Sequence, residues 1–568
     1  MDLGRALATV GRGTSAAKLE SEQLDFRQPG ATDKATFNDL AEASVCFANG
    51  SGGTIVLGVR DQPGAGAFTG THLDPSLVRR RIFELTDPPL DATVSTLLHA
   101  NMRLILIQIQ EGVEVHATKK GYAYRRTGTD CRPMTPADIT RLSEERRGVD
   151  WSSTSSGRSV NDMDDLARRR LRALLSESGL PTAVALSRRS DVDIVAALSL
   201  TATDGKLNRA GELFLCQAPP GQAVDRVVYQ HRRTRGGEAT AALRWGTPLL
   251  VAIEEALAAI ITRQQMVPVT LRTGIQLQIE DYPTVAVREA LVNAVAHGDP
   301  RAHRPVQIEH SVDALTVSSP GPLVSGITTQ NILTRGSRPR FASMLPILRE
   351  TRLAEALGQG VDRMFRAMVA SGRDVPVIED RGEEVTVTFA GQAPNKRVAE
   401  FVRSLPEEEQ NDTDALLALH VLCRRPSVNA RDIAPVIQRS VDESRNVLHR
   451  LSTGEARLVE PTKGTLGRRL PSYRLRHDVL AALGPAVVYR RRDTAEVAGK
   501  VIDHLREYGY INNATLQRLF DVDVYQARDI LRDLVGREIL VRTSEQSRGT
   551  AVRYGSGPRF PGRRGSRG

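Results

Sequence analysis

The sequence predicts a multidomain α+β protein. Its 568 residues exceed what a single hydrophobic core usually supports. Strand-type and helix-type patterns alternate as far as Gly391, and the chain beyond is Arg-rich and helical. The expected parts are a domain at 15–145, a flexible linker at 146–160, a mixed connector at 161–280, a second domain at 281–392, helical modules at 408–480 and 493–556, and a basic disordered tail at 557–568.

Residues 15–145 predict an α/β domain. A helix with apolar side chains at i, i+3, i+4 and i+7, beginning at Phe37, precedes a tight turn at 49–53, where small residues permit positive φ. Residues 54–59 are β-branched and residues 104–109 are continuously apolar, which is typical of strands. The basic, aromatic segment HATKKGYAYRRTGT follows.

Three motifs in this domain, ESEQLDFR, FANGSGGTIVLGVRD and YAYRRTG, resemble the Schlafen-type AlbA-like domain. The resemblance implies an AlbA-like α/β fold that binds nucleic acid, with DNA favoured and RNA as an alternative. A basic cluster could contact phosphates, which supports affinity without selecting a sequence. The cluster is Lys119, Lys120, Arg125 and Arg126.

The same resemblance implies an alternative. In Schlafen relatives three carboxylates at these motif positions form a metal-dependent RNA-cleaving site, and here they would be Glu20, Asp25 and Asp61. Clustered carboxylates can hold a divalent ion and activate water. The simpler interpretation makes Glu20 and Asp25 surface charges and Asp61 a turn residue.

The segment between the two domains shows no catalytic constellation. Residues 148–159 are rich in Ser and Gly and predict a flexible linker. Residues 211–217 and 226–230 look like strands. We expect this connector to pack as a scaffold on the next domain.

The segment VREALVNAVAHGDP places Glu289, Asn293 and His297 at successive i, i+4 steps of one predicted helix, so that they share a face. Amide and carboxylate oxygens suit Mg²⁺, which also binds substrate phosphates. The row therefore suggests a nucleotide site. The alternative is a buried amphipathic helix whose few polar groups are satisfied.

This row resembles the N-box of the GHKL ATPases, in the branch found in bacterial ATP-binding transcriptional regulators. The resemblance implies an α/β sandwich that binds ATP and Mg²⁺. Asn293 would carry the metal, Glu289 would position a water for any weak ATP hydrolysis, and His297 would lie near the phosphates or support a lid. The family has HRDY where this chain has HGDP.

Two glycine segments follow in the same order as in that family. In SSPGPL, Gly321 would let the backbone approach the base. In LGQGVDRM, Gly358 and Gly360 open a helix whose free N–H groups could bind phosphate. A Gly- and Arg-rich segment at 325–343 lies where such a fold has a lid, and Arg335, Arg338 and Arg340 could reach the phosphates.

The two C-terminal modules are predicted winged helix-turn-helix units. In the second, residues 524–538 form the candidate recognition helix, because Arg and Gln side chains can contact base edges in the major groove. Its outward face, with one wing residue, offers Tyr525, Gln526, Arg528, Arg532 and Arg548.

Composition agrees with a nucleic-acid partner. The formal net charge is +10, and a basic chain favours anionic partners. Four widely separated cysteines argue against a disulfide framework or a zinc site and fit a reducing cytoplasm. No sustained apolar run predicts a signal peptide or a membrane span. A homodimer is compatible with these domain types.

The leading hypothesis is an ATP-binding regulator, foremost of transcription, in which nucleotide state modulates DNA binding. The first alternative is a Schlafen-like nuclease in phage defence with a GHKL sensor domain. The second is a protein-interaction adaptor whose nucleotide and metal sites are degenerate.

Overall fold

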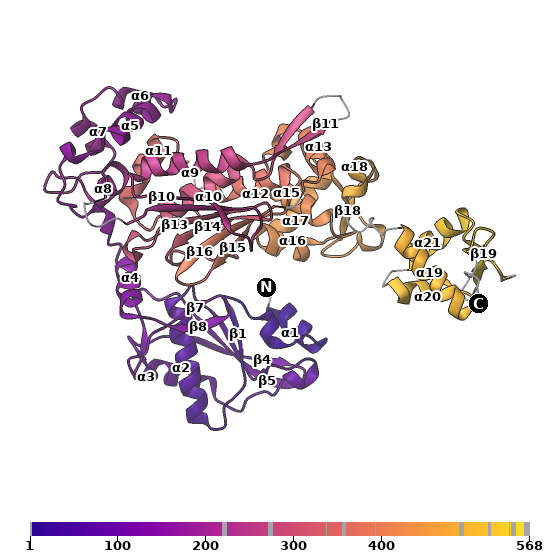
Figure 1. Ribbon diagram of the computed structural model, residues 1–568. Coiled ribbons are helices and arrows are strands. Elements are labelled where there is room, and N and C mark those ends of the chain that lie inside the picture. The colour runs from indigo at the N-terminus through magenta and orange to yellow at the C-terminus, as the bar shows by residue number, and fades with distance from the viewer. Residues whose placement is uncertain are drawn as a thin grey trace. The chain divides into compact units, whose positions relative to one another are not determined.

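The computed structural model describes residues 3–218, 224–270, 276–336, 338–354, 359–391, 393–487, 494–520, 524–544, 546 and 552–561. These residues form a mixed α+β, multidomain protein, as expected from the sequence (Figure 1). The chain divides into two compact units, Met1–Val421 with Ser427–Arg476, and Leu422–Pro426 with His477–Gly568. Among the described helices, none is long and apolar enough to cross a membrane.

The N-terminal domain is built on a four-stranded sheet in the order β1-β2-β5-β4. Strand β1 runs parallel to β2, whereas β2–β5 and β5–β4 are antiparallel. Helix α2 is capped by Thr32, whose side chain accepts a hydrogen bond from Ala35 N, and most of the helix is buried. The elements are α1 (Leu3–Gly11), η1 (Ala16–Leu19), β1 (Leu24–Arg27), α2 (Asp33–Asn49), β2 (Gly53–Leu57), η2 (Ala65–Ala67), α3 (Pro75–Leu85), β3 (Thr86–Asp87), β4 (Thr93–His99), β5 (Met102–Ile109), β6 (Ala117–Thr118), β7 (Tyr124–Thr127), β8 (Asp130–Pro133) and α4 (Pro136–Arg146).

The segment expected to be a flexible linker is packed instead. Trp151 lies against Phe341 with ring centroids 5.6 Å apart, and Ser152 is fully buried. The Asp150 carboxylate accepts hydrogen bonds of 2.8 Å from the backbone N and the hydroxyl of Ser343. One aromatic anchor and one carboxylate therefore fix a stretch whose Ser/Gly composition predicted mobility.

The connector is helical where one strand was predicted. Residues 211–217 fall largely within α8, because Asn208 caps its start by accepting a hydrogen bond from Gly211 N. The second predicted strand, at 226–230, is confirmed by β9. The elements are η3 (Trp151–Ser153), η4 (Val160–Asp162), α5 (Asp165–Glu177), α6 (Pro181–Leu186), α7 (Asp191–Ala197), α8 (Arg209–Leu215), β9 (Val227–Arg232), β10 (Ala239–Trp245), α9 (Leu249–Arg263), β11 (Met266–Thr270) and β12 (Gln276–Glu280).

A six-stranded sheet in the order β10-β9-β13-β14-β16-β15 forms the centre of the second domain. Two of its strands come from the connector, and β9 pairs in parallel with β13. Helices α9, α10 and α12 lie along one side of this sheet (Figure 1), and their apolar side chains belong to the largest core cluster of the described residues. The elements are α10 (Thr284–His297), η5 (Pro300–Ala302), β13 (Val306–His310), β14 (Ala314–Pro320), η6 (Ala342–Met344), α11 (Leu345–Glu350), α12 (Gly360–Ala370), β15 (Val377–Asp380) and β16 (Glu384–Ala390).

Two C-terminal modules share one order of elements, in which helices precede a two-stranded antiparallel sheet. The first module packs within the larger unit as far as Arg476, apart from Leu422–Pro426, and the second belongs to the smaller one. The elements are α13 (Lys396–Ser404), α14 (Glu407–Gln410), α15 (Thr413–Leu422), α16 (Ala430–Ile437), α17 (Val441–Thr453), β17 (Val459–Pro461), η7 (Lys463–Thr465), β18 (Tyr473–Leu475), α18 (His477–Leu483) and η8 (Gly484–Ala486), followed by α19 (Thr494–Tyr508), α20 (Asn513–Phe520), α21 (Val524–Gly536), β19 (Leu540–Arg542) and β20 (Tyr554–Ser556).

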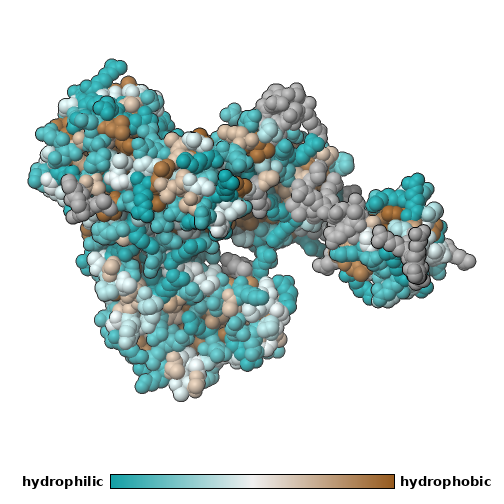
Figure 2. Space-filling view, viewed as in Figure 1, coloured by the Kyte–Doolittle hydropathy of each residue, from teal (hydrophilic) through white to brown (hydrophobic). Residues whose placement is uncertain are grey.

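The face shown in Figure 2 is dominated by hydrophilic residues. Apolar residues on it are scattered rather than gathered into one broad patch, which is normal for a protein surface.

Candidate functional site

A cavity of about 140 Å³ lies between α10, α12 and the central sheet. Its apolar side is formed by strand residues such as Val317, Val385 and Val387, and its polar side by α10 and the start of α12. Ligand pockets of drug size usually enclose roughly 300–1,000 Å³. A nucleotide triphosphate therefore requires part of the wall to move outward.

The predicted row on α10 faces this cavity. Glu289, Asn293 and His297 all line it, as their i, i+4 spacing predicted. Glu289 is 5% exposed, and its Oε1 accepts a 3.1 Å ion-paired hydrogen bond from Nη1 of Arg363 on α12. Arg363 was not identified from the sequence, because only the packing of α12 on α10 brings it to Glu289.

Asn293 provides the clearest sign of a binding position in the cavity. Its Nδ2 atom is buried and has no hydrogen-bond partner among the described residues. A buried donor without a partner costs roughly 1–3 kcal/mol, so such a group usually marks a place where a ligand or water is held. An amide offers both a donor and an acceptor, which fits a phosphate oxygen beside a metal ion.

Gly360 allows α12 to begin close to these side chains. A Cβ at this position would lie 2.7 Å from Glu289 Oε2 and 3.3 Å from Asn293 Nδ2. The glycine predicted to open the helix is therefore needed for close approach. Gly358, its predicted companion, lies outside the described residues.

His297 is the last residue of α10, and its imidazole is uncharged. Burial, and secondarily the charge of Arg340, lower the pKa of His297 to about 4. The imidazole is consequently neutral at pH 7, so it does not supply a positive charge for phosphates. Two roles were expected for His297, a place near the phosphates or support of a lid. Its buried surroundings favour the second, support of the wall that carries Arg338 and Arg340.

The three arginines expected to reach phosphates differ in position. Arg335 and Arg338 line the cavity, and Arg338 also donates 2.7 Å to Ser325 O. Arg340 is 8% exposed and donates 3.0 Å from Nε to His297 O, with a further bond to Pro322 O. Arg340 thus holds the end of α10 to the neighbouring loop instead of facing a ligand.

Gly321 turns the chain into the cavity wall. Its φ of +90° is a conformation that favours glycine, and its N–H donates 2.8 Å to Glu383 O. The next residues, Pro322 and Leu323, line the cavity, whereas Gly321 itself lies behind them against Asp299. The predicted direct contact between Gly321 and a base is therefore replaced by a role in the turn.

The N-terminal domain reaches this same wall. Arg125 Nη2 donates 3.2 Å to Leu323 O, and Leu323 N donates 2.9 Å to Asp380 of β15. Ser325 bonds to two carboxylates of the N-terminal domain, Glu111 and Glu145. The cavity wall at 322–325 is therefore held from both domains.

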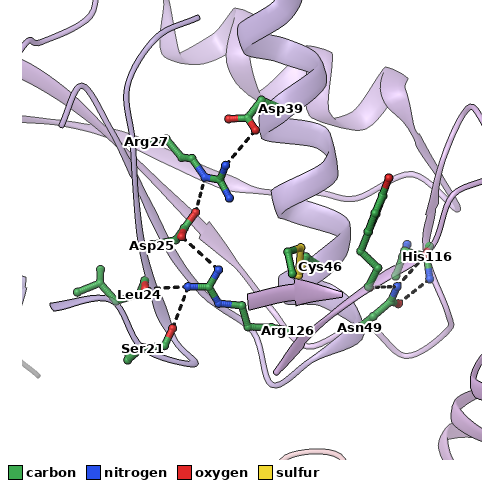
Figure 3. Close-up of a disulfide and its surroundings, with 11 residues drawn as sticks. Ser21, Leu24, Asp25, Arg27, Asp39, Cys46, Asn49, His116 and Arg126 are labelled. Atoms are coloured by element: carbon green, nitrogen blue, oxygen red, sulfur yellow. Dashed lines mark hydrogen bonds and ion pairs between the residues drawn. A yellow bond between two sulfur atoms is a disulfide. The ribbon is translucent and has the colours of Figure 1, made fainter. Parts of the chain in front are cut away.

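The N-terminal carboxylates do not form a metal-binding group. Asp25 is buried and paired with Arg27 at 2.6 Å and Arg126 at 3.1 Å (Figure 3). Asp61 accepts a 3.1 Å bond from Ala17 N, and Glu20 lies close to Asp25, which, after burial, raises the pKa of Glu20. Throughout the described part of the chain, no group of three or more His, Cys, Asp or Glu side chains is placed to hold a metal ion.

The basic cluster of this domain is only partly available to a nucleic acid. Arg126, 4% exposed, is buried against Asp25, Ser21 O and Leu24 O, and Arg125 is engaged with Leu323. Lys119 is exposed and pairs with Asp87 at 3.5 Å, and Lys120 is exposed. The two lysines remain candidates for phosphate contact, whereas Arg126 is a structural residue.

A disulfide joins Cys46 on α2 to Cys131 on β8 (Figure 3). The sequence argued against a disulfide framework, and it gave no sign of this single link; Cys216 and Cys423 are free and buried. The two linked residues are 85 positions apart, so their spacing gave no signal.

On α21, the predicted nucleic-acid face is exposed. Arg528 lies over the Tyr525 ring at 5.6 Å from its centroid and pairs with Asp529 at 3.4 Å. Arg532 has a side chain 74% exposed, 4.0 Å from Asp529. The side chain of Gln526 and all of Arg548 lie outside the described residues.

Together these features define a protein that joins a small α/β domain to a larger domain with a mostly apolar cavity that a few polar side chains line. Residues 20–135 match the family model "Schlafen, AlbA_2". Residues 303–389 match "Putative ATP-dependent DNA helicase recG C-terminal". No curated protein matches the chain.

The fold is similar to that of the DIP2311 protein from Corynebacterium diphtheriae, known from a crystal structure. The two chains are 23% identical with a TM-score of 0.51, over 85% of this chain and 97% of that chain. The chain thus contains a Schlafen AlbA-type domain and an ATPase-type domain.

Proposed function

We propose that this protein is an ATP-binding regulator of nucleic-acid function, most directly of transcription, in which nucleotide occupancy modulates DNA binding. The observation that carries the proposal is the buried, unpartnered Nδ2 of Asn293 in a cavity that also contains the Glu289–Arg363 pair. Such a cavity, with few convergent polar groups on an apolar background, is typical of a small-molecule site.

The residues have distinct roles in this proposal. Asn293 binds the phosphate–metal group through its amide, and Mg²⁺ would supply neutralisation of phosphate charge there. Arg363 positions the Glu289 carboxylate, which is the residue placed to orient a water if ATP is hydrolysed. Arg335 and Arg338 line the same cavity and can pair with phosphate oxygens.

The link to nucleic acid is proposed to run through the wall at 322–325. Nucleotide entry must displace part of this wall, which Arg125 and Glu145 hold from the N-terminal domain. Lys119 and Lys120 of that domain, and the exposed Arg528 and Arg532 of α21 in a winged-helix module, are the proposed phosphate and base contacts.

The test is titration calorimetry of the full chain with Mg-ATP, comparing wild type, Asn293→Ala and the matched control Asn446→Ala. Asn446 is exposed on α17. We expect micromolar binding that only Asn293→Ala abolishes, with circular dichroism showing that all three proteins are folded. Equal affinity in wild type and Asn293→Ala, or no binding in wild type, would refute the proposed site.

The regulatory step has its own measurement. Binding of a mixed-sequence DNA duplex to the wild-type protein is compared with and without Mg-ATP at one salt concentration, since phosphate contacts are salt-dependent. A change in affinity of about fivefold or more is expected, as for typical coupled sites. An unchanged affinity would leave a nucleotide site without the regulatory role.

A further inference from the structure

One wall of the nucleotide cavity is a compact turn at residues 326–336, which we call the lid turn. Ile327, Ile332 and Arg335 line the cavity from it. Asn331 ties the turn together, because its Oδ1 accepts 2.8 Å from Thr328 N and its Nδ2 donates 3.1 Å to Gly326 O. The lid turn is therefore expected to move as one body.

The side chain of Gln438, in the first C-terminal module, makes two hydrogen bonds to this turn. Its Nε2 donates 2.9 Å to Thr329 O, and its Oε1 accepts 2.8 Å from Leu333 N. A single amide thus satisfies one backbone acceptor and one backbone donor of the lid turn. Both bonds join segments more than 100 residues apart in sequence.

The position of Gln438 in its own module is equally specific. It is the C-cap of α16 with φ of 55°, a left-handed conformation uncommon outside glycine and asparagine. Only Arg439 separates it from Ser440, the N-cap of α17. The clamp therefore sits in the turn between the two helices of the helix-turn-helix pair.

The same module also contacts α12, which lines another part of the cavity. Arg366 on α12 donates 2.7 Å to Asn411 O, and Arg439 pairs with Asp414 at 2.6 Å. Burial, and secondarily the charge of Asp414, raise the pKa of Asp362 in the first turn of α12. The module thus contacts the lid turn and α12 together.

The helix pair is poorly suited to bind DNA in this arrangement. Its turn is occupied by the contact of Gln438 with the lid turn, so the turn is not presented to a DNA groove. The outward face of α21, by contrast, carries the exposed Arg528 and Arg532.

We propose that the first C-terminal module is a clamp on the nucleotide lid, in which Gln438 is the positioning residue, and that it does not contact DNA. The role assigned to the lid rests on the proposed nucleotide site. Opening of the cavity then requires the two Gln438 bonds to break, so that the rate of nucleotide exchange is set by a contact between domains.

Hydrogen–deuterium exchange of the full chain tests the clamp without nucleotide. Gln438→Asn keeps the amide and suits the left-handed backbone, but it is one methylene too short to reach both partners. We expect exchange at the Leu333 amide to be about tenfold faster in this variant. Gln330→Ala, at an exposed position of the same turn, should exchange as wild type does.

The outcomes separate the clamp from the nucleotide function. Equal exchange in wild type and Gln438→Asn overturns the clamp, even if wild type binds Mg-ATP. Protection of α17 by a mixed-sequence DNA duplex also overturns it, because the module would then bind DNA. Faster lid exchange in a protein that binds no Mg-ATP supports the clamp and refutes the nucleotide site.

Where Mg-ATP binds, dissociation of a fluorescent ATP analogue gives the functional measurement. Gln438→Asn is expected to release the analogue several-fold faster than wild type and Gln330→Ala, because its lid opens more readily. An unchanged dissociation rate despite faster lid exchange would overturn control of nucleotide exchange by the clamp.

Discussion

Arg363 Nη1 and Glu289 Oε1 lie 3.1 Å apart and join α12 to α10 at the polar end of the cavity. The arginine side chain is 28% exposed and the glutamate side chain 7%, so a buried carboxylate is paired with a partly exposed cation. The pair fixes where the carboxylate points, which is what a site for a phosphate–metal group requires.

Arg363→Met tests that relationship. Removing the cation leaves Glu289 buried beside a methionine, so we expect a loss of about 1–3 kcal/mol in the free energy of unfolding and weaker Mg-ATP binding. Urea denaturation and calorimetry measure the two effects. The double variant Arg363→Met with Glu289→Gln should recover stability but not affinity, and failure to recover stability would contradict the pairing argument.

Gly360→Ala should block the site by steric conflict alone. The new Cβ would lie 2.7 Å from Glu289 Oε2, so α12 or the carboxylate must shift. We expect Mg-ATP affinity to fall at least tenfold in calorimetry. Gly499→Ala is the control, because that helical glycine has open space around it and alanine there should stabilise by about 0.5–1 kcal/mol.

Stability should fall in mild acid because of His297. Its folded-state pKa of about 4 lies below the ordinary histidine value of 6.5, so the unfolded state binds more protons between these values. Stability is therefore lost as the pH falls from 6.5 towards 4, at up to about 1.4 kcal/mol per pH unit. His297→Gln should flatten this slope in denaturation at several pH values, whereas exposed His449→Gln should not.

Glu22, at the contact between the N-terminal and ATPase-type domains, should lower the stability of the protein as the pH rises, whereas His297 lowers it as the pH falls. Burial, and then the charge of Asp380, raise the pKa of Glu22 to about 7. Its contribution to stability is present below the ordinary glutamate pKa of 4.5 and is lost as the pH rises through 7. Glu22→Gln should therefore stabilise the protein by about 1–3 kcal/mol at pH 8 but not at pH 5.

The matched control for that measurement is Glu238→Gln, because Glu238 is exposed on the loop before β10. Thermal unfolding at pH 5 and pH 8 compares the two variants with wild type. Equal stabilisation by Glu22→Gln and Glu238→Gln, or a larger effect of Glu22→Gln at pH 5 than at pH 8, would contradict a buried carboxyl group at this contact.

The Cys46–Cys131 link should contribute to the stability of the N-terminal domain. It closes a separation of 85 residues, and such links typically add roughly 2–5 kcal/mol. Cys46→Ser, Cys131→Ser and the double variant should lose the same amount, since each removes the same bond. Peptide mapping without reductant verifies the link, and additive losses in the double variant would argue against it.

Local pattern was sufficient to predict the row on α10. Glu289, Asn293 and His297 share a face because four-residue spacing is a property of the helix itself, and all three line the cavity. The partner of Glu289 was not predictable, because Arg363 reaches it only through the packing of a second helix. The same limit applies to Gln438, whose role arises from contacts with residues 329 and 333.

The prediction of secondary structure from the sequence was wrong where an apolar run was short. The segment GELFLCQ suits a buried strand or a buried helix equally well by periodicity, and the capping side chain of Asn208 decides for α8. The Ser/Gly composition of 148–159 predicted mobility, but a single Trp151–Phe341 contact anchors it. Arg126 looked like a phosphate contact because sequence alone does not reveal that Asp25 buries it.

The parallel pairing of β9 with β13 determines where the ATPase-type domain can be cut. A fragment of residues 281–392 would leave the backbone groups of β13 that bond to β9 without partners along a sheet edge. Exposed edges of this kind pair with other chains and promote aggregation. Fragments for biochemical work should therefore start ahead of Val227, so that the sheet keeps the two strands that close this edge.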